Sequence, residues 1–279
     1  MARAWEKLLV ADRGHGPPVL LVHGQPGGAE DWDRLCRSLG DGQRLLVVDR
    51  PGYGNSGLEA RSMADNAELL ADLLADLTAD GGAVPAVVVG HSYGGGIALL
   101  MAARRPEVVA GVVLLAAVGA KNSVNGFDHL LAAPVLGEAL SAAGLFTLGR
   151  LLPPFRQLSS RLPAPFGAWL EVSLPDGRYA AELNHQGMRL WRTFLTEQRS
   201  LLASLGDLEL SMGRVRVPAI VASGTRDVVV PPRASAVLAA GIRGAELVSL
   251  AGVGHFVARD APDRVARLVR RVLQRAWPS

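Results

Sequence analysis

The strongest constraint on the fold is an alternation of short apolar runs with segments of helical periodicity. Strand-like runs occupy residues 8–11, 19–22, 45–49, 87–89, 112–116, 219–223 and 247–250. Residues 62–80 have helical spacing instead, since their leucines recur at intervals of three and four. Buried strands that alternate with helices in this way predict an α/β protein with a mainly parallel sheet.

One long segment interrupts this alternation. Residues 119–214 contain no convincing strand and hold five of the six phenylalanines, together with Trp169 and Trp191. We interpret them as a helical insertion between two parts of one core, 1–118 and 215–279. Its aromatic side chains can form a small core of its own or line the roof of a pocket, because ligand pockets are mostly apolar and aromatic. The candidates for substrate contact are Phe127, Phe146, Trp169, Trp191 and, outside the insertion, Phe256.

Composition narrows the class of protein. The 279 residues are 49% hydrophobic and 20% charged, which predicts one large folded domain with an insertion rather than a disordered chain. The net charge of 29 − 26 = +3 gives no reason to expect a nucleic-acid partner. Cys36 is the one cysteine, so no intramolecular disulfide forms. The longest apolar run, residues 108–120, is shorter than the ~20 residues of a membrane span. Since residues 1–14 also lack a signal-peptide pattern, we expect a cytoplasmic protein.

A G-x-S-x-G pattern lies at Gly90–His91–Ser92–Tyr93–Gly94. The run 87–89 leads straight into it and a helical segment leads straight out. A sharp turn between strand and helix needs small neighbours, because the backbone of its central residue is strained. The turn also lifts the hydroxyl of Ser92 clear of the sheet, which makes Ser92 a candidate nucleophile.

A second loop, residues 23–28, follows the run 19–22. It is placed to bring a free backbone N–H beside Ser92. Gln25 has such an N–H and Pro26 has none. Two N–H groups, those of Gln25 and Tyr93, are therefore predicted to form an oxyanion hole for a tetrahedral intermediate.

Asp227 and His255 each follow a later strand-like run, at the end of a strand where catalytic groups of open α/β sheets gather. Of the six histidines, His255 alone combines that position with neighbouring glycines and with the chain order Ser, Asp, His. His255 is the candidate general base and Asp227 the residue that orients it. His23 is expected to be structural, and His91, inside the turn, is expected to point away from Ser92.

These segments, together with Asp49–Arg50–Pro51–Gly52–Tyr53–Gly54–Asn55–Ser56, make the chain resemble the α/β-hydrolase superfamily, in its serine-nucleophile branch with a helical cap. The resemblance implies a mostly parallel eight-stranded sheet, a cap (lid) formed by the insertion 119–214, and no cofactor or metal. It also implies a structural role for Asp49. The sequence contains no H-E-x-x-H motif, no paired cysteines and no G-x-G-x-x-G after a first strand.

The function predicted first is hydrolysis of a small or medium, largely apolar carboxylic ester, through an acyl-enzyme on Ser92. Ser92 disfavours the epoxide hydrolases and haloalkane dehalogenases, which resemble this layout but have Asp at the nucleophile position. Three alternatives stay open. The first is a carbon–carbon bond hydrolase of a diketone-like acid, for which Arg189 or Arg192 could bind the carboxylate. The second is a cofactor-free haloperoxidase or perhydrolase. The third is a ligand-binding protein without catalysis.

Overall fold

The computed structural model describes residues 3–79, 85–143 and 177–278. Its strands β1 to β7 are Leu9–Arg13, Pro18–Val22, Arg44–Asp49, Ala86–His91, Val109–Leu115, Ala219–Gly224 and Glu246–Leu250. Its helices are α1 (Asp33–Leu39), α2 (Met63–Ala79), α3 (Tyr93–Arg104), α4 (Gly126–Ala132), α7 (Gly177–Met212), α8 (Pro232–Gly241), α9 (Val257–Asp260) and α10 (Pro262–Ala276). Short 3₁₀ turns occupy Ala4–Lys7, Ala29–Trp32, Gly40–Gly42 and Lys121–Ser123.

The strands form one sheet in the order β1-β3-β2-β4-β5-β6-β7. All neighbouring pairs are parallel except β1 with β3. The predicted α/β-hydrolase fold is confirmed, with one correction to the number of strands. The described residues form seven strands, not eight, because the chain has seven apolar runs and the eighth strand was implied by the resemblance alone. Strands β1 and β2 are consecutive in the chain but do not pair, since β3 lies between them.

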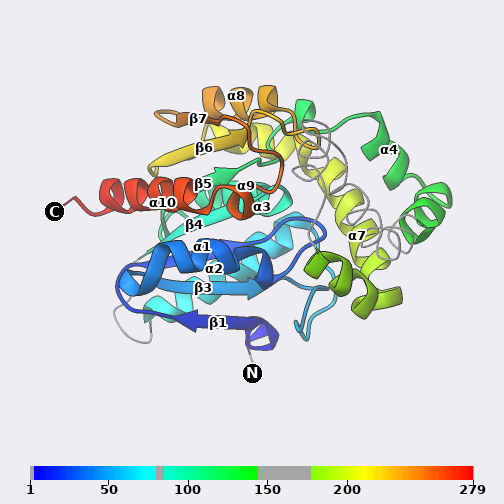
Figure 1. The fold of residues 1–279 in the computed structure, drawn as a ribbon, viewed down its shortest axis with the longest axis horizontal. Helices are drawn as coiled ribbons and strands as arrows, with labels where there is room; N and C mark the ends of the chain where they lie inside the picture. The colour runs from blue at the N-terminus through cyan, green and yellow to red at the C-terminus, as the bar shows by residue number, and fades with distance from the viewer. Residues whose placement is uncertain (1–2, 80–84, 144–176, 279) are drawn as a thin grey trace, which may run out of the picture.

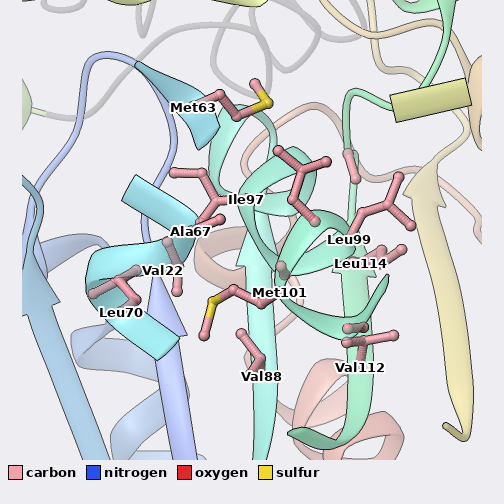
Figure 2. Packing of buried hydrophobic residues seen from close by; sticks show 14 of the residues in the cluster. Val22, Met63, Ala67, Leu70, Val88, Ile97, Leu99, Met101, Val112 and Leu114 are labelled. Carbon is pink, nitrogen blue, oxygen red and sulfur yellow. The ribbon is translucent and has the colours of Figure 1, made fainter. Parts of the chain in front are cut away.

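Helices cover both faces of the sheet, as Figure 1 shows. Helices α2, α3 and α8 pack on one face and α1, α9 and α10 on the other. The buried side chains form two hydrophobic clusters, the first under α2, α3 and α8 and the second under α1, α9 and α10. In strand β2, Leu20 and Val22 belong to the first cluster, whereas Val19 and Leu21 belong to the second. Strand β2 is therefore buried along its whole length, as expected of a sheet covered on both sides. Figure 2 shows the first cluster, in which Ile97 and Met101 of α3 pack among side chains of α2 and the central strands.

The described part of the segment between β5 and β6 is helical and contains no strand. Its two labelled helices, α4 and α7, lie together at the end of the sheet toward which β3 points (Figure 1). Helix α7 runs along α2 and α3, and one stripe of it is buried against the core. None of the described helices has both the length and the apolar character needed to cross a bilayer.

Candidate active site

Ser92 lies on the strained turn that the sequence predicts. Its backbone has φ 52° and ψ −117°, a conformation that residues with a side chain rarely adopt. Four hydrogen bonds hold it, because Ser92 N–H donates to Leu115 O at 2.9 Å and Ser92 O accepts from the N–H groups of Gly95, Val118 and Gly96 at 2.9, 3.2 and 3.4 Å. Such strain costs about 1–3 kcal/mol and persists only where its surroundings enforce it.

The glycines around Ser92 are required by close approach of the backbone. A Cβ on Gly90 would collide with Gly94 O, and a Cβ on Gly94 would collide with Val22 O. The same approach brings the β2 loop to the turn: a Cβ on Gly24 would lie 3.2 Å from Ser92 Cβ. The loop that contains Gln25 is therefore packed directly against Ser92.

Asp227 and His255 form a hydrogen-bonded pair. His255 Nδ1 donates to Asp227 Oδ2 at 2.9 Å, and the side chains are 8% and 0% exposed. The other carboxylate oxygen of Asp227 accepts the N–H groups of Val229 and Val230, both at 2.9 Å. These bonds fix the carboxylate and leave Nε2 of a neutral His255 as a proton acceptor.

His91 connects the Ser92 turn to His255. The two histidine rings lie 4.7 Å apart between centroids, and His91 Nε2 donates to His255 O at 2.9 Å. Burial, with a smaller contribution from His255, lowers the pKa of His91 to about 3. His91 is thus a neutral donor that holds the His255 backbone, a role that the sequence did not predict.

The backbone N–H groups of Gln25 and Tyr93 have no hydrogen-bond acceptor among the described residues. Tyr93 begins α3, so its N–H belongs to the first turn, where a helix offers no acceptor. The Gln25 side chain is held from α7, because Gln25 Nε2 donates to Gln198 Oε1 at 2.7 Å. Gln198 Nε2 in turn donates to Asp128 of α4 at 3.1 Å.

The five residues predicted to contact substrate lie in different environments. The Phe256 ring lies 5.7 Å from that of His255 and is beside the site. Trp191 is half-buried on α7 with the Arg192 guanidinium 5.4 Å above its ring. Phe127 is 61% exposed on α4, which argues against a place in an enclosed pocket. Phe146 and Trp169 lie outside the described residues.

The contacts of two further residues bear on their expected roles. Asp49 has a structural role, since its oxygens accept the N–H groups of Ala29 and Asn55 at 2.8 and 3.0 Å. Arg189 donates to the carbonyl oxygens of Leu58 and Ser56 at 2.9 and 3.4 Å, which ties α7 to the loop before α2.

Sequence reasoning missed a buried ion pair beside the site, Arg50 with Glu197, both 0% exposed. Tyr53 Oη also donates to Glu197 Oε2 at 2.6 Å. Burial raises the pKa of Glu197, and the Arg50 guanidinium opposes that shift. One sequence signal was present: Glu197 interrupts the apolar stripe of α7 between Leu190 and Leu201.

Comparison with known proteins identifies the family. Residues 19–268 match the model of the alpha/beta hydrolase family, to which the chain therefore belongs. The expectation of a hydrolase is confirmed. The 2-hydroxymuconate semialdehyde hydrolase of Pseudomonas sp. (strain CF600) is 25% identical over 95% of this chain and 89% of its own. The pimeloyl-[acyl-carrier protein] methyl ester esterase of Neisseria meningitidis is 26% identical, over 90% and 91%.

The solved structures show the same fold. A thermophilic esterase from Thermogutta terrifontis superposes with a TM-score of 0.71 at 23% identity, covering 96% of this chain and 93% of that one. At this identity the likeness concerns the fold.

Proposed function

We propose that the protein is a serine hydrolase that cleaves a small or medium, largely apolar carboxylic ester. The observation that carries the proposal is the Asp227–His255 hydrogen bond next to the strained turn of Ser92. A serine that is held on a strained turn, with an oriented imidazole nearby, is the arrangement that activates a hydroxyl as a nucleophile.

In the proposed mechanism, Ser92 Oγ attacks the ester carbonyl carbon while His255 Nε2 takes the hydroxyl proton. The negative oxygen of the tetrahedral intermediate accepts hydrogen bonds from the N–H groups of Gln25 and Tyr93. His255 then gives the proton to the leaving alcohol, and an acyl-enzyme remains on Ser92. Water, deprotonated by His255, releases the acid and restores Ser92. Asp227 stabilises the imidazolium that forms twice in the cycle.

The preference for an apolar substrate is supported by Phe256, which packs edge-on against His255. We further propose that the insertion 119–214 is a cap over the site. This proposal is supported by a chain of hydrogen bonds from its helices to the Gln25 loop. Gln198 of α7 bonds to the Gln25 side chain and also to Asp128 of α4. A cap of this kind excludes water and selects the substrate by shape.

A fluorophosphonate probe tests the proposal directly. We expect purified protein to be labelled at Ser92, as located by mass spectrometry of the modified peptide, and Ser92→Ala to be unlabelled. Hydrolysis of a series of esters with increasing acyl length then defines the preferred substrate. Folded wild-type protein that is neither labelled nor active, but binds a ligand and releases it unchanged, would instead support the non-catalytic alternative.

The second candidate function is carbon–carbon bond hydrolysis of a diketone-like acid, which the similarity to the 2-hydroxymuconate semialdehyde hydrolase favours. This reaction needs a cation for the substrate carboxylate. Arg189 is already engaged with two carbonyl oxygens, which leaves Arg192 as the better candidate on α7. Activity on such acids that is lost in Arg192→Ala, with ester hydrolysis retained, would favour this reaction over the first.

A further inference from the structure

Arg50 holds the peptide group that supplies one of the two proposed oxyanion donors. Its Nη2 donates to Gly24 O at 2.6 Å and its Nε donates to His23 O at 3.0 Å. A second donor reaches the same Gly24 oxygen, since His23 Nδ1 lies 2.9 Å from it. Gly24 O and the N–H of Gln25 belong to one planar peptide unit.

The planarity of that unit transmits the contact. In a trans peptide such as Gly24–Gln25, the C=O and the N–H point in opposite directions. A guanidinium that fixes Gly24 O on one side therefore fixes the direction of the Gln25 N–H on the other. The positive charge of the Arg50 guanidinium beside the carbonyl oxygen also polarises the peptide and strengthens its N–H as a donor.

The orientation of Arg50 depends in turn on α7. Glu197 accepts from both Nη1 and Nη2 of Arg50, the second at 3.2 Å, and Tyr53 donates to the same carboxylate. The Arg50 guanidinium also lies 4.9 and 5.0 Å from the ring centroids of Tyr53 and Tyr93. With the pair fully buried, no water competes for these contacts.

We propose that Arg50 and Glu197 are positioning residues for the oxyanion hole, with Glu197 of α7 orienting Arg50 and Arg50 orienting the Gly24–Gln25 peptide. The inference rests on the proposed function. It makes one helix of the insertion a part of the catalytic apparatus rather than only a cover. It predicts that damage to this pair weakens binding of the transition state more than binding of the substrate.

Three variants test the proposal on the full chain. Arg50→Lys keeps the charge beside Glu197 but replaces the fork of donors with a single ammonium. Glu197→Gln keeps the side-chain volume and one acceptor. The double variant Arg50→Met with Glu197→Gln removes both buried charges and therefore remains foldable if a single variant does not. Thr193→Val is the matched control, because Thr193 lies one turn earlier on α7 and donates to Gly52 O at 3.2 Å, an oxygen outside the 23–28 loop.

The main measurement is the affinity for a trifluoromethyl ketone of the preferred ester's shape. Ser92 Oγ adds to its carbonyl carbon, the proton moves to His255, and the carbonyl electron pair becomes an oxyanion in the hole. We expect kcat to fall about 10- to 100-fold in Arg50→Lys and in the double variant, with a smaller loss in Glu197→Gln. KM should stay within about threefold, and Ki for the ketone should rise by the factor by which kcat/KM falls.

A purely structural role predicts another pattern. If the variants displaced the triad, the pH profile of kcat/KM would move, whereas we expect it to match the wild-type profile. A folded double variant with wild-type kcat, or a loss of kcat without weaker ketone binding, would overturn the proposal. If the wild-type protein neither hydrolyses esters nor binds the ketone, the proposed function itself fails and this inference falls with it.

Discussion

The imidazole of His91 donates a hydrogen bond to the carbonyl oxygen of His255 at 2.9 Å, so the residue before the nucleophile holds the backbone of the residue proposed as its base. The two side chains come from turns 164 residues apart. Because His91 is buried, it makes this bond as a neutral ring, and protonation would place a buried cation beside the His255 ring.

This contact predicts an acid-dependent loss of stability. The pKa of His91 in the folded protein is about 3, below its usual value of 6.5, so the unfolded chain binds a proton that the folded chain does not. Stability from this group is complete above pH 6.5 and falls by up to about 1.4 kcal/mol per pH unit as the pH drops toward 3.

Urea unfolding at several pH values measures this effect. His91→Gln retains an amide donor without a titrating group, so its free energy of unfolding should decline less steeply below pH 6.5, by about one proton. His23, whose pKa burial also lowers, contributes a similar slope that remains in the variant. Equal slopes for the wild type and His91→Gln would contradict the assignment.

Asp227→Asn should inactivate the enzyme without unfolding it. The N–H groups of Val229 and Val230 both donate to one side-chain oxygen of residue 227. Because that position requires an acceptor, the amide oxygen of asparagine would occupy it and the amide NH₂ would face His255 Nδ1. His255 must then carry its proton on Nε2, where it cannot accept the proton of Ser92. We expect kcat to fall about 10³- to 10⁴-fold. Asp12→Asn, which alters only an exposed ion pair with Arg44, is the control. Circular dichroism checks that both variants are folded.

Two glycine substitutions should have opposite effects on stability. Gly94→Ala places a Cβ against the carbonyl oxygen of Val22, where neither backbone can move, and should cost several kcal/mol or prevent folding. Gly206 lies in α7 with open space around its Cβ position. Gly206→Ala should therefore raise the free energy of unfolding by about 0.5–1 kcal/mol. Destabilisation by Gly206→Ala would show that α7 does not continue through this residue as a regular helix.

Removing one member of the buried ion pair should be costly. Glu197→Ala leaves the Arg50 guanidinium buried without its carboxylate and should lower the free energy of unfolding by about 3–5 kcal/mol. Arg50→Met added to Glu197→Ala removes the stranded charge and should recover part of that loss. Chemical denaturation of both variants provides the measurement. A loss below about 1 kcal/mol for Glu197→Ala would mean that water reaches the pair.

Much of the core could be predicted because its signals are local. The expected run 87–89 is β4 (Ala86–His91), and the expected helix 62–80 is α2 (Met63–Ala79). Buried strands and amphipathic helices show their periodicity within a few residues, and the chain order of Ser92, Asp227 and His255 then suggests where their ends meet. Capping was less predictable. Asp260 is a residue type that favours helix starts and lies just before the last helix, but it ends α9, and Ala261 precedes α10.

The sequence by itself determined the layered fold and indicated the candidate nucleophile. In a parallel sheet the carboxyl ends of the strands lie at one edge, so the loops that follow them come together there without any further information. Only the tertiary structure placed β3 between β1 and β2, since the turn glycines Gly14 and Gly16 pack against the backbone of residues 41–43. Only the tertiary structure paired Arg50 with Glu197, which are 147 residues apart. The physical reason is that local periodicity fixes which face of an element is buried, whereas the partner of a buried charge depends on how separate elements pack.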